Sequence, residues 1–230
     1  MTTAAHRRDH RSILAASEKR LLVRVARALP HAIHSDHLSG MALAAMVAAG
    51  AGFAAMRVTW WGAAIVIAGL AANWFGDSLD GTLARVRGHE RPRFGYYVDH
   101  VIDMLGMVAL FTGMAVSGLM TPVIALAVLV GYLLMCAESF LGTHATGVFR
   151  MSVWGVGPTE LRIVLAIGTV YAARGAAVNL PWGAHATLFD VGGAIAAGGL
   201  GSAFVFSALQ QTIALYRAEP RPVVAPSVEV

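Results

Sequence analysis

The chain has 230 residues, of which 57% are hydrophobic and only 13% are charged. A soluble domain carries nearer a quarter charged residues, so this composition argues against a soluble protein and favours one embedded in a membrane. The net charge of +4 is not gathered into a basic patch interleaved with stacking aromatic residues, so nucleic acid is not an expected partner. The single cysteine, Cys136, excludes a disulfide within the chain.

Residues 1–34 are predicted to form a basic cytoplasmic tail followed by an amphipathic helix next to the membrane. From Ser12 to Leu29, apolar and basic side chains alternate at roughly helical spacing, and Pro30 ends the pattern. Such a helix lies in the membrane interface with its cations near anionic lipid head groups. The alternative is a solvated helix that packs on the body of the protein. The basic side chains of this segment are Lys19, Arg20, Arg24 and Arg27.

Six apolar segments follow, each about long enough to cross the hydrocarbon core of a bilayer, although the first two are short. They predict an all-α, polytopic integral membrane domain with six transmembrane helices over residues 35–216. The remaining residues, 217–230, contain three prolines and are expected to form a disordered cytoplasmic tail. The six apolar segments are residues 38–56, 59–76, 97–118, 121–142, 160–178 and 187–212.

The basic residues predict how the chain is oriented in the membrane. If the N-terminus is cytoplasmic, six crossings leave only Arg57 and Arg174, two of the 17 Lys and Arg residues, on the outer side. The positive-inside rule therefore places both termini in the cytoplasm. The compact, alanine-rich chain is typical of bacteria, so we expect a multi-pass protein of the cell (inner) membrane.

A pattern of acidic and small residues begins at the end of the second apolar segment. It reads D-x-x-D-G-x-x-A-R, then nine residues, then G-x-x-x-D-x-x-x-D. In its first half, Asp77, Asp80, Gly81 and Ala84 lie three, four and seven residues from the first aspartate. On a helix, these four residues share one face.

The second half of the pattern opens the third apolar segment. Gly95, Asp99 and Asp103 repeat every four residues and line one face of a helix. The linker between the halves contains Gly88 and Pro92, which favour a turn, so the two helices can run antiparallel and bring four carboxylates together.

Four acidic groups at one membrane face need positive charge between them. An all-oxygen cluster without cysteine or an obvious histidine pair suits Mg²⁺ or Mn²⁺ better than Zn²⁺. The alternative is a pair of interfacial helices with solvated carboxylates and glycines that permit close packing. The residues alone do not choose which of the four acids acts as a base.

This pattern resembles the signature of the CDP-alcohol phosphotransferases, also called CDP-alcohol phosphatidyltransferases, and all eight specified positions are met. The resemblance implies a metal-dependent enzyme that transfers a substituted phosphoryl group from a CDP-alcohol to a hydroxyl acceptor in phospholipid biosynthesis and releases CMP. It makes Asp77, Asp80 and Asp99 ligands of two metal ions, and it makes Asp103 both a possible ligand and the general base. It also implies a homodimer.

The small residues of the pattern are candidates for nucleotide binding. At Gly81, Ala84 and Gly95, a flat cytosine and its ribose can approach the helix backbone, and in the resembled family these positions line the nucleotide pocket. Asp80 belongs to the same set. Arg85, one helical turn beyond Gly81, can pair with phosphate or hold the aspartate side chains in place.

Four further residues are candidates for substrate contacts. Glu138 is an ionisable group inside the fourth apolar segment, which marks a functional candidate; the alternative is a hydrogen bond to a neighbouring helix. Glu160 ends a Gly-Pro-Thr-Glu stretch that resembles the choline- and ethanolamine-phosphotransferase branch, and Arg162 follows this stretch, although Glu160 also suits a helix N-terminus. Arg150 is a candidate phosphate contact or an ordinary cytoplasmic arginine.

The start of the first apolar segment departs from the family. Members often carry Pro-Asn-x-x-Thr there, whereas this chain has Ser35 and Asp36 in place of the first two residues, followed by His37, Leu38 and Ser39. We assign no catalytic role to this stretch and interpret Asp36 as a helix cap.

The substrates stay open at this point. His100 after Asp99 resembles the branch that uses CDP-choline or CDP-ethanolamine with a diacylglycerol-like acceptor, whereas CDP-diacylglycerol with a small polar alcohol is the commoner bacterial donor system. Two functions outside this reaction are a membrane prenyltransferase, which needs two separated acidic motifs, and a non-catalytic transporter, which places its ionisable residues near the middle of the membrane.

Overall fold

The structure is a computed structural model that describes residues 15–147, 158–175, 178–179 and 185–219. These residues form helices joined by short connections, and one pair of two-residue antiparallel strands, β1 (Val178–Asn179) and β2 (His185–Ala186). The helices are α1 (Ala15–Ala28), α2 (Ser35–Ala55), α3 (Trp61–Arg87), α4 (Pro92–Ser117), α5 (Pro122–Thr146), α6 (Pro158–Ala173) and α7 (Leu188–Ala218).

Helices α2, α3, α4, α5 and α7 are long and apolar enough to cross a membrane, which confirms the predicted all-α membrane fold. The fifth of the six predicted segments differs from expectation. Its helix, α6, has only 16 residues, fewer than the roughly 20 that a perpendicular crossing needs. It ends at Ala173, because Arg174 and Gly175 follow and Gly175 has a backbone φ of +70°.

Helix α2 packs against both α3 and α4, whereas α3 and α4 have hardly any direct contact with each other. Small residues bring α2 close to its neighbours. A Cβ atom added to Gly113 of α4 would overlap the carbonyl group of Gly50 on α2, and one added to Gly76 of α3 would lie 2.7 Å from the carbonyl oxygen of Leu38. Next to this contact, the buried Asn73 donates a hydrogen bond of 3.1 Å to the Ala42 carbonyl oxygen.

The turn between α3 and α4 forms where the sequence predicts it. Gly88 ends α3 in the left-handed region with φ of +66°, which glycine adopts without strain. Pro92 opens α4, where its missing N–H costs no helical hydrogen bond. The two helices run antiparallel as expected, but α2 holds them apart.

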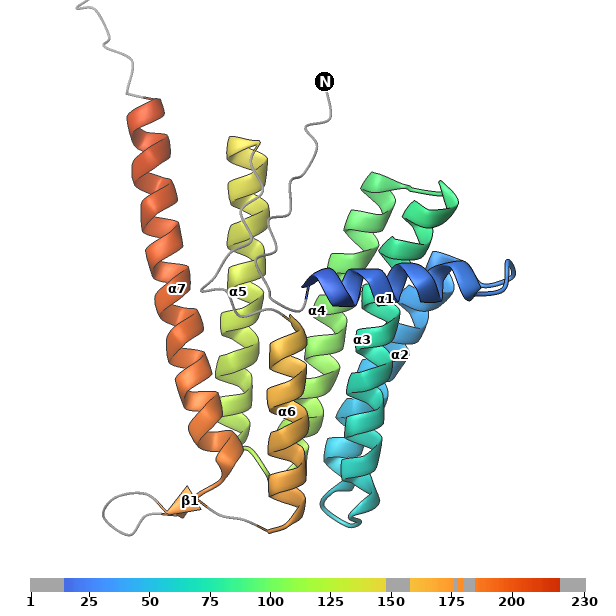
Figure 1. Cartoon of the computed structure of the whole chain (residues 1–230). Coiled ribbons are helices and arrows are strands. Elements are labelled where there is room, and N and C mark those ends of the chain that lie inside the picture. Colours follow the sequence, from blue (N-terminus) through green and yellow to red (C-terminus); the bar gives the residue numbers. More distant parts are fainter. Residues whose placement is uncertain (1–14, 148–157, 176–177, 180–184, 220–230) are drawn as a thin grey trace, which may run out of the picture.

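The second half of the bundle is built by α5 and α7, which lie side by side in Figure 1, and by α6, which packs against α3. One apolar core joins the two halves. Its largest fully buried side chains include Phe53, Leu110 and Met114, and the ring of Phe53 meets the edge of Phe189 on α7 at a centroid distance of 5.6 Å.

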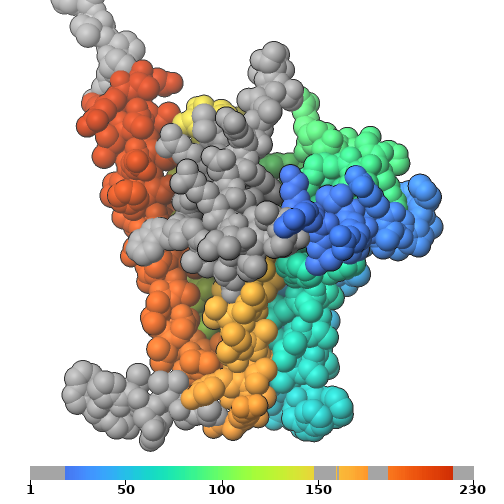
Figure 2. All heavy atoms as spheres, in the orientation of Figure 1, coloured from blue at the N-terminus to red at the C-terminus, as the bar shows by residue number. Residues whose placement is uncertain are grey.

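Helix α1 runs crosswise to the long helices and packs against α3 (Figure 1). The described part of the predicted amphipathic segment is helical, although Ser12 to Leu14 lie outside the described residues. Its inner face contacts the body of the protein, and its outer face lies on the surface of the molecule in Figure 2. This packing agrees with the second alternative, and the placement of the outer face in the membrane interface stays a prediction.

The contact between Gly113 and Gly50 yields a stability prediction. Replacing Gly113 with alanine forces α2 and α4 apart, and such overpacking costs about 1–3 kcal/mol of stability. We expect a lower melting temperature of the detergent-solubilised protein. Gly198→Ala on α7 is the matched control, because an added Cβ there meets nothing within 4 Å. Equal melting temperatures for the two variants would contradict this packing.

Candidate active site

The four aspartates of the acidic pattern come together from two helices. Asp77 and Asp80 lie in the last turns of α3, and Asp99 and Asp103 lie in the first half of α4. Asp103 interacts electrostatically with each of the other three, and Asp80 does so with Asp77 and Asp99. The helices that carry them are held apart by α2, so the four carboxylates flank a shared space.

Asp80 is fixed by a neighbour that the sequence did not assign. The Ser39 hydroxyl on α2 donates a hydrogen bond of 2.6 Å to Oδ2 of Asp80, and the backbone N–H of Gly81 donates to Oδ1. Ser39 occupies the last position of the stretch that replaces Pro-Asn-x-x-Thr, where serine supplies the same hydroxyl as threonine. That shared chemistry was the signal that could have identified it.

Asp77 forms an ion pair with Arg162 of α6, with 2.6 Å between Nη2 and Oδ2. Both side chains are mostly shielded, with 14% of Arg162 and 23% of Asp77 exposed. Arg162 was predicted to contact substrate near the active site. The structure brings it to the acidic group, where its described partner is a carboxylate, and it also acts electrostatically on Asp103.

Helix α5 contributes two residues that sequence reasoning missed. The Tyr132 and Cys136 side chains interact with each other, and both interact electrostatically with Asp103. They lie four residues apart, so they share the face of α5 that borders Asp103. Nothing in their own sequence context distinguishes them from packing residues, because their role depends on which face of α5 meets α4.

His100 lies within aromatic packing beside Asp99. Its Nδ1 is 2.7 Å from the carbonyl oxygen of Tyr96 and 3.7 Å from Oδ2 of Asp99. Its ring lies 4.2 Å from that of Tyr96 and 5.3 Å from that of Phe140 on α5, measured between centroids. These contacts fix the orientation of His100 and place α5 against the start of α4.

The four carboxylates do not converge on one point. Within the part of the chain that the structure describes, no three His, Cys, Asp or Glu side chains are placed to hold a metal ion together. Asp77 and Asp80 instead face Arg162 and Ser39. The donor set still fits a hard divalent cation, because it consists of carboxylate oxygens within electrostatic reach of one another. Shared coordination therefore requires these side chains to turn from their present partners toward the ion.

The predicted nucleotide residues lie along the end of α3 and the start of α4. Gly81 lies beside the guanidinium of Arg85, which donates a hydrogen bond of 3.1 Å to the Thr82 hydroxyl. A Cβ added to Gly95 would meet nothing within 4 Å, so the backbone of α4 is open there. Ala84 contributes to the wall of a pocket.

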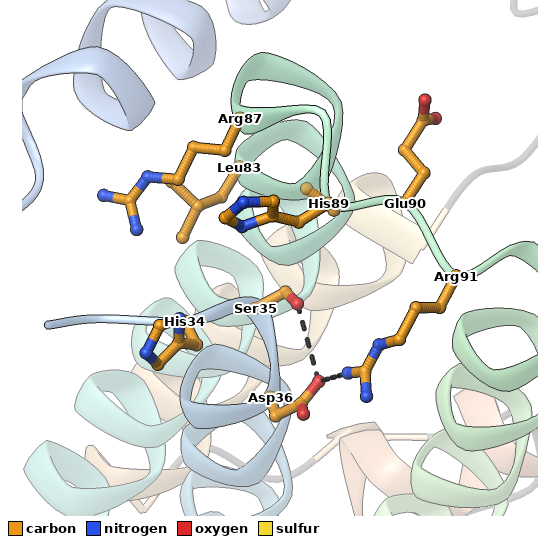
Figure 3. A pocket seen from close by; sticks show the side chains of 9 residues that line it. His34, Ser35, Asp36, Leu83, Arg87, His89, Glu90 and Arg91 are labelled. Carbon is orange, nitrogen blue, oxygen red and sulfur yellow. Dashed lines mark hydrogen bonds and ion pairs between the residues drawn. The ribbon is translucent and has the colours of Figure 1, made fainter. Parts of the chain in front are cut away.

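This pocket has a volume of about 400 Å³ and lies between the start of α2 and the turn that joins α3 to α4 (Figure 3). Arg91 forms an ion pair with Asp36 across it. Asp36 lies inside the first turn of α2, after the cap residue His34, so the interpretation of Asp36 as the helix cap was wrong. The pocket is lined by His34, Ser35, Asp36, Leu83, Ala84, Arg87, His89, Glu90 and Arg91.

A comparison with known protein families matches residues 35–195 to the family described as CDP-alcohol phosphatidyltransferase. The chain belongs to this family. Members transfer a phosphate-containing group from a CDP-alcohol in phospholipid synthesis and are generally dependent on a divalent metal. No individually curated protein matches the chain significantly.

The remaining candidate residues of this family member have different outcomes. Oε1 of Glu138 accepts a hydrogen bond of 2.8 Å from Ser207 of α7, which is the alternative that the sequence offered: a hydrogen bond to a neighbouring helix. Arg150 lies outside the described residues, as does the side chain of Glu160.

The ion pair between Asp77 and Arg162 predicts that a mutation of Arg162 costs more stability without metal than with it. Arg162→Met leaves a shielded carboxylate without its cation, which we expect to cost about 1–3 kcal/mol in metal-free protein. A divalent cation should restore part of that loss, since it supplies the missing charge. Thermal unfolding with chelator and with Mn²⁺ measures both effects.

Arg174→Met is the control for this experiment, because Arg174 is exposed beyond the end of α6. It should leave stability and its metal dependence unchanged. A loss in Arg162→Met that Mn²⁺ does not reduce would contradict a shared role of Arg162 and metal at Asp77.

Proposed function

We propose that this protein transfers a substituted phosphoryl group from a CDP-alcohol to a hydroxyl acceptor with release of CMP, in a metal-dependent step of phospholipid synthesis. The observation that carries the proposal is that four carboxylates from α3 and α4 lie within electrostatic reach of one another, beside a pocket at the same ends of these helices. Phosphoryl transfer needs charge neutralisation, alignment and removal of a proton, and this arrangement contains a group for each need.

The acids divide into ligands and a base. Asp77, Asp80 and Asp99 would hold two ions, Mg²⁺ or Mn²⁺, with Asp103 as a further possible ligand. Such ions, when bound, neutralise charge on the pyrophosphate and on the departing CMP. Ser39 positions Asp80, and Arg162 holds Asp77 until substrate and metal enter.

Asp103 is the general base of the proposed reaction. Its carboxylate takes the proton of the acceptor hydroxyl as the acceptor oxygen bonds to the phosphorus that carries the alcohol. The bond between that phosphorus and the oxygen of CMP breaks, and CMP leaves with the electron pair. Its place among the other three acids, beside Tyr132 and Cys136 of α5, supports this role.

The nucleotide would extend from the acids along the end of α3. Gly81, Ala84 and Gly95 leave room beside the backbone, and Arg85 offers a cation to phosphate. The pocket that adjoins Ala84 has space for a flat base, and its lining mixes Arg87 and Arg91 with Asp36 and Glu90. We assign the CMP portion to this path.

We further propose that the active site opens to the cytoplasm, with both termini on that side of the inner membrane, and that the enzyme is a homodimer. The orientation rests on the distribution of basic residues. The donor is either CDP-diacylglycerol, with a small polar alcohol as acceptor, or CDP-choline or CDP-ethanolamine, with a diacylglycerol-like acceptor.

Exchange of label between CMP and a CDP-alcohol tests the reaction directly. Membranes that contain the protein, labelled CMP, Mn²⁺, one of the three donors and its proposed acceptor should form labelled CDP-alcohol, because transfer to the acceptor is reversible and its reversal consumes CMP. Comparing CDP-diacylglycerol, CDP-choline and CDP-ethanolamine identifies the donor. Asp103→Asn should abolish the exchange, since it leaves no base, whereas Glu138→Gln is the matched control and should retain it. Exchange with none of the three donors would refute the proposal.

Ser39 provides a test of how Asp80 is positioned. Ser39→Ala removes the described side-chain donor to Asp80, and loss of such an outer partner typically lowers metal affinity or activity by about 10–100-fold. We expect the Mn²⁺ concentration for half-maximal exchange to rise by about that factor. Ser39→Thr keeps the hydroxyl and should restore the wild-type value, whereas equal values for both variants would show that the hydroxyl has no such role.

A further inference from the structure

Helix α1 packs directly on the acidic segment of α3. Leu22 and Ala26 of α1 are buried in one cluster with Leu38 of α2 and with Leu79 and Leu83 of α3. Leu79 and Leu83 belong to the same helical turns as Asp80 and Ala84 and occupy a neighbouring side of them. A shift of α1 therefore acts on the helical turns of α3 that carry Asp80 and Ala84.

The connection from α1 to α2 is also fastened to the end of α3. The guanidinium of Arg87 donates hydrogen bonds to the carbonyl oxygens of Leu29 and Pro30, at 2.9 and 3.0 Å, and to that of Ile33. One side chain thus holds three backbone groups of the connection. Any shift of α1 acts on α3 both through this clamp and through the apolar cluster.

The outer face of α1 is cationic. Lys19, Arg24 and Arg27 are exposed, and none of the three forms an ion pair or hydrogen bond with another described residue. Leu21, of which 49% is exposed, lies on the flank between this face and the buried one. Figure 2 shows α1 on the outside of the bundle beside α3.

We propose that this outer face binds the head groups of anionic phospholipids in the surrounding bilayer and that this binding strengthens the docking of α1 on the acidic segment, so that catalysis depends on anionic lipid. The regulatory part rests on the proposed function. The charge and the position of the outer face identify lipid head groups as its ligand. The cations lie beside a membrane-crossing helix at the level of its acidic end, where lipid head groups are the nearest abundant anions. A zwitterionic head group carries no net charge to attract them.

The strength of docking explains why lipid matters. Among the α1 side chains that the structure describes, from Lys19 to Ala28, Leu22 and Ala26 are the buried ones, so the described contact with α3 is small. Each basic residue near an anionic surface strengthens membrane binding by about fivefold. Two such residues therefore change the equilibrium constant for docking by about 25-fold.

Nanodiscs of two compositions test the inference, one of phosphatidylcholine alone and one with equal parts of phosphatidylcholine and phosphatidylglycerol. Hydrogen exchange is measured for residues 20–28 of α1 and for residues 79–83 of α3, and CMP exchange is measured on the same samples. With phosphatidylglycerol, we expect amide exchange in both segments to slow by about tenfold and CMP exchange to rise by several-fold. High salt should weaken both effects.

The double variant Arg24→Gln with Arg27→Gln should lose the response to phosphatidylglycerol. The control is Arg93→Gln with Arg217→Gln, which removes two exposed cations from other helices and should keep the response. Equal protection of α1 in both lipids, or an undiminished response in the first variant, overturns the inference. If α1 exchanges its amides as slowly in detergent without lipid as in nanodiscs with phosphatidylglycerol, the inference is also overturned, since a second copy or another anion would then bind the outer face.

The two proposals fail in different ways. If no CDP-alcohol supports CMP exchange in either lipid, the proposed function fails, while the hydrogen exchange of α1 and α3 still decides whether anionic lipid controls the docking. If CMP exchange occurs equally in both lipids, the regulatory inference fails and the proposed function stands.

Discussion

The repulsion among four carboxylates is the constraint on which the rest of the site depends. Asp77, Asp80, Asp99 and Asp103 lie within electrostatic reach of one another in the low-dielectric surroundings of a helix bundle, where like charges repel strongly. Among the described residues, the fold answers with Arg162 of α6 at Asp77, and with the Ser39 hydroxyl of α2 and the backbone N–H of Gly81 at Asp80. Without such partners these acids would not remain together, and a site that gathers them is prepared to accept further positive charge.

Helix α2 makes this arrangement possible because it holds α3 and α4 apart. Its contacts at Gly50 and near Gly76 are close enough to fix the positions of both neighbours, so the distance between α3 and α4 is set by α2 rather than by their own side chains. The same helix supplies Ser39. A single element therefore sets both the width of the acidic space and the orientation of one of its acids.

The spacing of the acidic residues was sufficient to predict much of this site. Helical periodicity places Asp77, Asp80 and Ala84 on one face, and Gly88 and Pro92 predict the turn, because both inferences depend on local geometry alone. The all-α membrane fold likewise followed from composition and the length of the apolar segments.

Features that depend on contacts between distant segments were not predictable in this way. The ion pair of Arg162 with Asp77 joins residues 85 positions apart, and the border formed by Tyr132 depends on how α5 is rotated. The carboxylates were expected to converge, but in the described residues they do not. A sequence pattern specifies a shared helix face, whereas the side-chain rotamers depend on nearby hydrogen-bond donors.

The periodicity of α3 gives its acidic end two working surfaces. One side carries the acids and the small residues beside them. A neighbouring side, with Leu79 and Leu83, packs against α1. Both sides belong to the same rigid helical turns. A change in how tightly α1 packs against Leu79 and Leu83 therefore shifts the acids without any contact between α1 and the acids. A peripheral helix with an unneutralised cationic face is thus placed where the state of the membrane surface can act on the chemistry.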